Sequence, residues 1–251
     1  MGGDRPIGPR GRIASGLSAL IQPVGAGFKP APITFALPPA RVFFPFSLQY
    51  NDRRGTKPRT LEETLLIHPT AVVETEDVGE NTRIGPFTFI EKGVRIGRNC
   101  VIGNGCYIQD GVVLSDGIHI EGGVFVWQGV YLEEDVFVGP HVVFTNLLNP
   151  RAEAFPARPE ALLQTKIGKG ASLGANSTIL CGHIIGPYAV VGAGSTLTHS
   201  VRAHEVVVGN PARHQGWACK CGETLYDIRV CLRCGRKYEM IDTGLRRLRD
   251  S

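Results

Sequence analysis

The sequence predicts an all-β protein built as a parallel β-helix of hexapeptide repeats, with a small cysteine-rich module at its C-terminus. Three observations support this: an apolar residue at every sixth position, a turn-forming residue three places later, and four cysteines near the end of the chain. A period of six fits neither a helix nor simple strand alternation, so the chain must wind in a repeating coil. The apolar positions, broken only after residue 144, are Val78, Ile84, Ile90, Ile96, Ile102, Ile108, Leu114, Ile120, Val126, Leu132, Val138, Phe144, Ile167, Leu173, Ile179, Ile185, Val191 and Leu197.

The other positions of each hexad support the coil. If the apolar position is i, then i+4 is small or β-branched, which suits a tight interior. Position i+3 is Gly, Asn or Asp in nine of the eleven hexads from Asn81 to His141, and these residues accept positive φ at low cost. We therefore expect corners at i+3 and short strands from i+4 to the following i+1. Three hexads close one coil, which stacks about 4.8 Å above the last.

Composition predicts one long core in a chain of 251 residues with 43% hydrophobic content. No apolar stretch is long enough to span a bilayer. The net charge of +4 is uneven, because residues 1–60 carry nine Lys/Arg against Asp4 and Asp52, which leaves the remainder at −3. The charge therefore gives no argument for a nucleic-acid partner. The odd cysteine total of seven favours a reducing, cytoplasmic compartment.

Three regions follow from these patterns. Residues 1–60 hold nine of the 17 prolines and no repeat, which predicts a disordered extension. A targeting peptide and upstream sequence from a misassigned start are the alternatives. Residues 61–215 form the β-helix, with an inserted loop at 145–166, and residues 216–251 form the C-terminal module.

The outward strand position, i+5, is apolar in eight of the eleven hexads. A lone prism in water would not coat its walls in this way, so we expect a homotrimer that buries them. Loops lying over the walls are the alternative. The apolar residues concerned are Phe89, Val101, Tyr107, Val113, Phe125, Tyr131, Phe137 and Val143.

The break at Thr145–Lys166 predicts a binding loop, because a long excursion from a regular coil more often serves binding than stability. Its Asn146, Asn149 and Arg151 suit a phosphate or carboxylate of the substrate. A tolerated surface insertion is the alternative.

Several stretches together resemble one family. They are GPHVVFTNLLNPRAE after Val138, KIGKGASLGANSTILCGHIIG, VGAGSTLTHSV and VVGNPARHQGW. They resemble the hexapeptide-repeat nucleotide-sugar N-acetyltransferases, over about residues 66 to 240. The resemblance implies a left-handed coil and transfer of acetyl from acetyl-CoA to a sugar amine, in a cleft between neighbouring subunits of a trimer.

The resemblance also places the pantetheine arm of CoA along the later coils, which need small residues there. Gly-rich corners with free backbone amides could bind the developing oxyanion. The candidates are Gly174, Ala175, Gly192, Ala193 and Gly194. Lys166, Lys169 and Arg213 are candidates for the CoA phosphates, with ordinary surface cations as the alternative.

This sequence differs from its nearest relatives at the position of the general base. Those relatives carry a Gln-Asn-Asn run that places an Asn beside the amine. Here that run is Glu121-Gly122-Gly123, so the amide is absent. His141 lies eighteen residues after Gly123 and should occupy the same corner one coil later, roughly 5 Å away. We therefore expect His141 to be the general base or amine-orienting group, assisted by Glu121. The alternative is a histidine that merely tolerates positive φ.

The C-terminal cysteines form two short turns, Cys219-Lys-Cys221-Gly and Cys231-Leu-Arg-Cys234-Gly. Four thiolates in two such turns suit a structural, zinc-ribbon-like zinc site, and a module this small could hardly fold without one. Two disulfides are the alternative.

The leading function is an acetyl-CoA-dependent N-acetyltransferase that acts on a UDP- or dTDP-linked amino sugar for surface polysaccharide, such as lipopolysaccharide. A non-catalytic hexapeptide scaffold or assembly subunit is the rival. An O-acyltransferase of the same fold is a third possibility.

Overall fold

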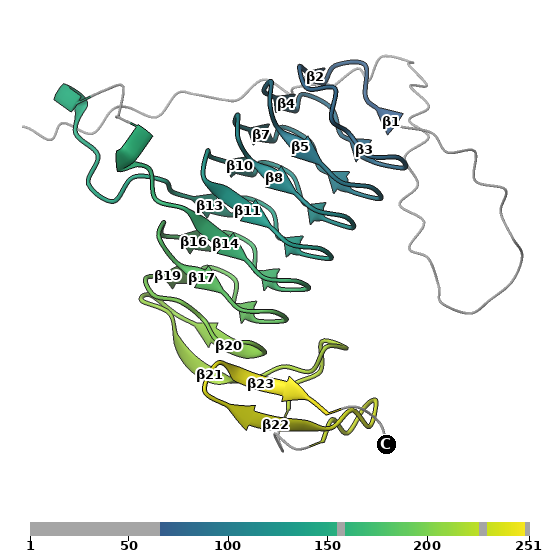
Figure 1. Ribbon diagram of the computed structural model, residues 1–251, viewed down its shortest axis with the longest axis vertical. Helices are drawn as coiled ribbons and strands as arrows, with labels where there is room; N and C mark the ends of the chain where they lie inside the picture. The colour runs from purple at the N-terminus through teal and green to yellow at the C-terminus, as the bar shows by residue number, and fades with distance from the viewer. Residues whose placement is uncertain (1–65, 155–158, 226–229, 249–251) are drawn as a thin grey trace, which may run out of the picture. The chain divides into compact units, whose positions relative to one another are not determined.

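The computed structural model describes residues 66–154, 159–225 and 230–248. The expected extension at 1–60 and the loop residue Arg158 lie outside these ranges. The described chain winds into a parallel β-solenoid whose coils stack in a single column (Figure 1). The prediction of an all-β hexapeptide solenoid is confirmed.

Three parallel sheets form the walls of the solenoid. Away from the first coil, the excursion and the last coil, each strand pairs with the strand eighteen residues later, as in Phe89 with Tyr107 and Arg95 with Val113, so three hexads close one coil. Sheet A has nine strands: β1 (Leu66–Ile67), β3 (Arg83–Ile84), β6 (Val101–Ile102), β9 (His119–Ile120), β12 (Phe137–Val138), β15 (Ser172–Leu173), β18 (Val190–Val191), β20 (Glu205–Val208) and the antiparallel β21 (Arg213–Trp217).

Sheets B and C complete each coil. Sheet B contains β2 (Val72–Val73), β4 (Phe89–Ile90), β7 (Tyr107–Ile108), β10 (Phe125–Val126), β13 (Val143–Phe144), β16 (Thr178–Ile179) and β19 (Thr196–Leu197). Sheet C contains β5 (Arg95–Ile96), β8 (Val113–Leu114), β11 (Val130–Leu132), β14 (Thr165–Ile167) and β17 (Ile184–Ile185). Most strands are two residues long rather than the expected four, since only i+5 and the following i form strand and the turns are formed by i+2 and i+3.

The core is the stacked interior of the coils. Residues at i and i+4, such as Ile120 and Val124, are fully buried, as predicted. Burial of each such side chain contributes about 1.5–3 kcal/mol to folding before conformational entropy is subtracted. Every i+3 residue from Asn81 to His141 has positive φ, including the two exceptions to the Gly/Asn/Asp pattern, Phe87 and His141. The predicted corners are therefore confirmed.

The excursion leaves the solenoid after β13 and returns at β14. It carries two short 3₁₀ helices, η1 (Ala152–Ala154) and η2 (Pro159–Ala161), which project to one side of the column (Figure 1). Thr165 and Lys166 already lie in β14, so the excursion ends at Gln164, slightly earlier than the sequence suggested. The insertion keeps the register, since Tyr131 pairs with Lys166 and Val143 pairs with Thr178.

The C-terminal module packs on the last coils. Its hairpin joins β22 (Tyr238–Ile241) to β23 (Gly244–Arg247), and Ala203 of the solenoid bridges to Gly244. His204 is only 4% exposed and lies between the rings of Tyr188 and Tyr238, with Nδ1 2.7 Å from the carbonyl oxygen of Ala218. This contact joins the module to the solenoid.

Candidate active site

The edge where sheet A turns into sheet B, called here the A–B edge, collects most of the predicted site. Its i+3 residues are Phe87, Gly105, Gly123, His141, Asn176 and Gly194. Backbone hydrogen bonds stack these corners coil on coil: Gly105 N to Pro86 O, Gly123 N to Asn104 O, His141 N to Gly122 O, Asn176 N to Pro140 O and Gly194 N to Ala175 O, at 2.8–3.1 Å.

The imidazole of His141 lies over the corner one coil below. A Cβ atom added at Gly123 would stand 2.4 Å from His141 Nδ1 and 2.5 Å from Cε1. The side chain of His141 is exposed, and within the described ranges no protein group hydrogen-bonds its ring. A ring nitrogen is therefore available to take a proton from a bound amine.

Glu121 lies on the same edge but pairs with a different histidine. Its Oε1 is 3.0 Å from Nε2 of His119, and the His119 ring lies 5.5 Å from the ring of Phe137. The structure therefore brings Glu121 and His141 to one edge without a hydrogen bond between them. The assisting role of Glu121 stays a prediction, since a hydrogen bond to His119 does not test it.

The glycine-rich corners stack tightly, which explains their composition. A Cβ at Gly174 would lie 2.4 Å from the nitrogen of Ala193. The amides of Gly174, Gly192 and Gly194 donate to carbonyls of neighbouring coils at 2.8 Å, so the expectation that they are free for an oxyanion is wrong. The coil-to-coil bonds do not use the amides of Ala175 and Ala193, which leaves these two as candidate donors.

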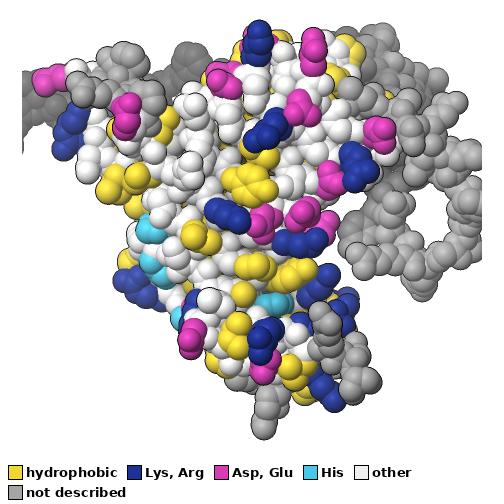
Figure 2. Space-filling model, in the orientation of Figure 1, with side chains coloured by type: hydrophobic (Ala, Val, Ile, Leu, Met, Phe, Trp, Pro, Cys, Tyr) yellow, Lys and Arg dark blue, Asp and Glu magenta, His cyan; other side chains and the backbone are white. Residues whose placement is uncertain are grey.

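Lys166 and Lys169 lie away from the A–B edge. Lys166 is on the outer face of sheet C, with Nζ 2.7 Å from Glu133 Oε1. Lys169 is at the edge between sheets C and A, with Nζ 3.8 Å from Glu134 Oε2. The hydrogen bond from Lys166 is the largest cause of the lowered pKa of Glu133. Figure 2 shows cationic and anionic side chains interspersed over this face. Each of the two lysines forms an ion pair with a glutamate of its own chain.

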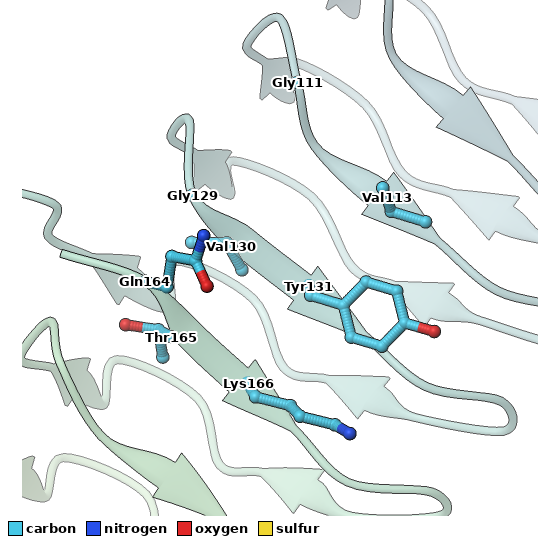
Figure 3. A pocket seen from close by; sticks show the side chains of 8 residues that line it. All are labelled: Gly111, Val113, Gly129, Val130, Tyr131, Gln164, Thr165 and Lys166. Atoms are coloured by element: carbon cyan, nitrogen blue, oxygen red, sulfur yellow. The ribbon is translucent and has the colours of Figure 1, made fainter. Parts of the chain in front are cut away.

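A hollow of about 320 Å³ lies at the foot of the excursion, on sheet C (Figure 3). Tyr131 and Lys166 project beside it from adjacent strands, with the ammonium 5.7 Å from the ring centroid. Gln164, Gly111 and Gly129 complete much of its lining. This hollow is not on the A–B edge.

Arg213 continues the A–B edge, whereas the predicted substrate residues of the excursion do not lie on it. Arg213 opens β21 opposite Val208, whose side chain lies against Gly192. Its guanidinium donates to the carbonyl of Ala212 at 2.9 Å.

Asn146, Asn149 and Arg151 leave the solenoid from the edge between sheets B and C. The carbonyl of Asn146 accepts from the amide of Leu163, and Arg151 donates to the carbonyl of Pro150, both at 2.9 Å. Within one chain, these three residues and His141 lie on different edges.

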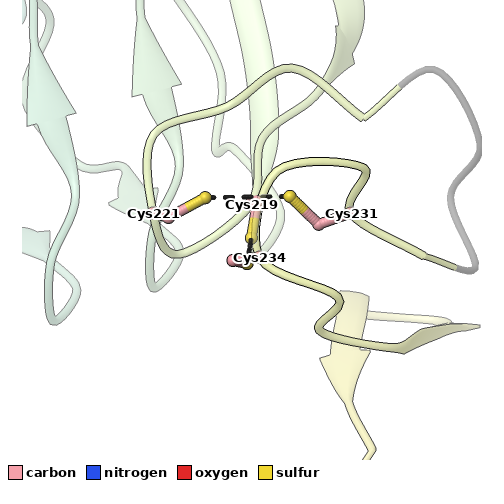
Figure 4. A group of neighbouring side chains, drawn as sticks. All are labelled: Cys219, Cys221, Cys231 and Cys234. Carbon is pink, nitrogen blue, oxygen red and sulfur yellow. Dashed lines mark hydrogen bonds between the residues drawn. The ribbon is translucent and has the colours of Figure 1, made fainter.

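The four C-terminal cysteines converge (Figure 4). The sulfurs of Cys219, Cys221, Cys231 and Cys234 all lie within 4.8 Å of one another. The Sγ–Sγ distances are 3.5 Å for Cys219 and Cys234 and 3.7 Å for Cys221 and Cys231, and none of the four cysteines forms a disulfide. Tetrahedral zinc with bonds of about 2.3 Å places its sulfurs about 3.8 Å apart, so the set fits that ion.

Phe87 is the residue of this edge that the sequence pattern could have singled out and did not. It is a large apolar side chain at an i+3 corner, and the structure leaves it 74% exposed. Its departure from the Gly/Asn/Asp rule was the available signal.

Comparison with known proteins places the chain in a class. The family described as "Bacterial transferase hexapeptide (six repeats)" matches residues 77–110 and 164–199. The chain is 45% identical over 182 residues to dTDP-3-amino-3,6-dideoxy-α-D-galactopyranose 3-N-acetyltransferase of Aneurinibacillus thermoaerophilus, covering 72% of this chain and 93% of that enzyme. Serine acetyltransferase 2 of Arabidopsis thaliana is 54% identical over 48 residues, which cover 19% of this chain and 15% of that protein.

Two solved structures overlap more loosely. AntD, an N-acyltransferase from Bacillus cereus solved with dTDP-4-amino-4,6-dideoxyglucose and coenzyme A, gives a TM-score of 0.43 at 19% identity, covering 61% of this chain and 80% of that one. The acetyltransferase domain of PglB from Neisseria gonorrhoeae, solved with acetyl coenzyme A, gives 0.38 at 20% identity, covering 60% and 57%.

The fold and its repeat define a hexapeptide transferase. At 45% identity over nearly the whole length of the Aneurinibacillus enzyme, the chain belongs more specifically to the hexapeptide-repeat nucleotide-sugar N-acetyltransferases. No helix in the described ranges is both long and apolar enough to cross a membrane.

Proposed function

We propose that the protein transfers the acetyl group of acetyl-CoA to the amine of a nucleotide-linked amino sugar. The observation that carries this is the relationship to the Aneurinibacillus enzyme over 93% of its length. A dTDP-linked 3-amino-3,6-dideoxyhexose is the first acceptor to test, because that enzyme's name specifies this class, and a UDP-linked amino sugar is the second.

Residues of the A–B edge can supply both a proton acceptor and donors for the oxyanion. The neutral sugar amine attacks the thioester carbonyl carbon, and the imidazole of His141 accepts the proton that the nitrogen loses. The amides of Ala175 and Ala193, which the coil-to-coil bonds leave unused, would donate to the oxyanion. As the C–S bond breaks, the CoA thiolate leaves and is protonated by the imidazolium. The reaction thus converts one amine and one thioester into one amide and one thiol.

The direct experiment measures release of the CoA thiol with each sugar nucleotide, with the acetylated product identified by mass spectrometry. Protein without acceptor, and acceptor without protein, are the controls. Turnover with a dTDP- or UDP-amino sugar supports the proposal. Calorimetry that detects no binding of CoA, together with no turnover on any amino sugar, overturns it in favour of a scaffold.

A homotrimer is part of this proposal. Phe125 and Val143 are both 48% exposed on the outer face of sheet B, beside the stacked rings of Phe89 and Tyr107. Such a wall is costly in water and suits burial against a second copy. Within one chain Lys166, Lys169, Asn146, Asn149 and Arg151 lie away from the A–B edge, so their predicted ligand roles would require a second subunit.

Structural zinc on Cys219, Cys221, Cys231 and Cys234 is proposed from the donor set. Four thiolates and no open position suit a structural ion, which would hold the module together and take no part in acetyl transfer. Tyr238 OH lies 3.1 Å from Cys219 Sγ and the Tyr238 ring contacts the buried His204, so the metal would also hold the module against the solenoid.

Left-handed winding of the coil, a cytoplasmic location and a role in supplying surface polysaccharide complete the proposal. The odd total of seven cysteines supports that compartment, because disulfide pairing would leave one thiol over.

A further inference from the structure

Phe87 is an unusual residue for its place on the A–B edge. It has a φ of 57° and a side chain 74% exposed, whereas the other i+3 residues of the edge are Gly, Asn or His. Left-handed backbone is unfavourable for a bulky residue, and exposure of its ring to water is also unfavourable. Because most of the ring is exposed, packing of the side chain offsets neither the backbone strain nor the cost of its exposure.

The first coil holds Phe87 in this position. The amide of Phe87 donates to Oγ1 of Thr70 at 3.2 Å, and Nδ1 of His68 lies 2.9 Å from the same hydroxyl. These contacts with Thr70 and His68 of the preceding coil hold the backbone of Phe87 in place.

The path from Phe87 to His141 carries no bulky side chain. The corners between them are Gly105 and Gly123; a Cβ at Gly105 would meet nothing within 4 Å, and the space above Gly123 holds the His141 ring. Three coils separate Phe87 from His141, or about 14 Å along the edge. A ribose and two phosphates separate a nucleobase from its sugar, which is a length of the same order.

We infer that the Phe87 ring is the stacking platform for the nucleobase of the sugar nucleotide, with the amino sugar lying toward His141. Aromatic faces stack on bases of any sequence, and this ring is exposed and held in place. Arg83, at the start of β3, is exposed on the adjoining outer face of sheet A, where a cation would suit the diphosphate. This inference rests on the proposed function and adds a residue that selects nucleotide-linked over free amino sugars.

The test replaces Phe87 with Asn and with Tyr. Asn suits the left-handed corner and removes the ring, so F87N should fold with an unchanged or higher Tm, whereas F87Y keeps the ring. We expect F87N to raise KM for the sugar nucleotide about 5- to 100-fold. Its kcat and its KM for acetyl-CoA should change little, and F87Y should resemble the parent protein.

The corresponding amino-sugar 1-phosphate, which lacks the base, gives a second readout. F87N should act on it as the parent does, because no stacking is lost. Leu232→Asn, at a residue 80% exposed on the cysteine module, is the matched control for loss of an exposed apolar side chain.

An F87N protein with an unchanged KM for the sugar nucleotide overturns the inference while acetyl transfer by the parent still stands. Equal losses on both acceptors overturn it, and so does loss of the oligomer on light scattering, which would make Phe87 an interface residue. A parent protein that binds neither CoA nor nucleotide defeats the proposed function itself.

Discussion

The ring of His141 occupies the space where a side chain at Gly123 would stand, with Nδ1 2.4 Å from that virtual Cβ. The glycine of one coil thus leaves the space that the histidine ring of the next coil fills. The glycine is needed for its φ of +71° and also for the room that it leaves to the imidazole.

Replacing Gly123 with Ala should displace the His141 ring and lower kcat about 10- to 100-fold, because small misplacements of a catalytic group are costly. Gly111→Ala is the matched control, since it has a similar φ of +77°, an ordinary contact of 3.5 Å at its Cβ and a place on another edge of the solenoid. Both variants should lose about 1–2 kcal/mol of stability from backbone strain. Equal kcat values in the two variants would refute the role of the contact.

His141→Asn should lower kcat about 10²- to 10⁴-fold, because an amide cannot accept the amine proton. Asn already occupies the equivalent corner at position 176 with a φ of 56°, so the backbone should be undisturbed. The measurement is the rate of thiol release across pH, which should lose the limb assigned to the imidazole. A kcat within a few-fold of the parent removes His141 from the mechanism.

Cys221→Ser should reduce bound zinc from about one ion per chain and lower Tm, since a structural site loses one of its four ligands. Metal content by atomic absorption and thermal unfolding check this. Cys181→Ser is the control, because that buried thiol lies outside the cysteine cluster. Parent protein containing no zinc and oxidised thiols would contradict the site.

Phe125→Asp should dissociate the proposed homotrimer, because it places a charge on the apolar wall of sheet B. Light scattering should report a smaller mass, and acetyl transfer should fall if the site lies between subunits. Leu232→Asp, on the cysteine module, should leave the mass unchanged. An F125D protein that remains a trimer would place the interface on another face.

Acidification should weaken the junction around His204. Burial lowers the pKa of His204 below its usual value, against the opposing hydrogen bond to Ala218. Below about pH 6.5 the unfolded chain therefore binds this proton first, and the free energy of unfolding falls as pH drops from about 7.5 to about 5.5. His204→Asn, which tolerates the φ of 64°, should show a smaller fall in Tm over that interval. Zinc loss at low pH would affect both proteins alike, and equal falls would contradict the assignment.

Much of the candidate site could be read from residue spacing. Counting eighteen residues from Gly123 to His141 was enough to place both on one edge, because each coil consumes a fixed number of residues. Side-chain partners could not be obtained in this way. Glu121 pairs with His119, two residues earlier in the chain, and Lys166 pairs with Glu133 beside the neighbouring strand, because rotamers respond to whichever partner lies within reach.

The sequence by itself determined the solenoid, its interior and its corners, since a strict six-residue pattern permits only one way to bury the apolar positions. Tertiary structure decided which corner amides remained available: Gly174, Gly192 and Gly194 give theirs to the neighbouring coil. It also decided that Phe87 is exposed one coil below the open corner at Gly105. Both depend on what lies one coil away, and a linear pattern does not specify the geometry of that contact.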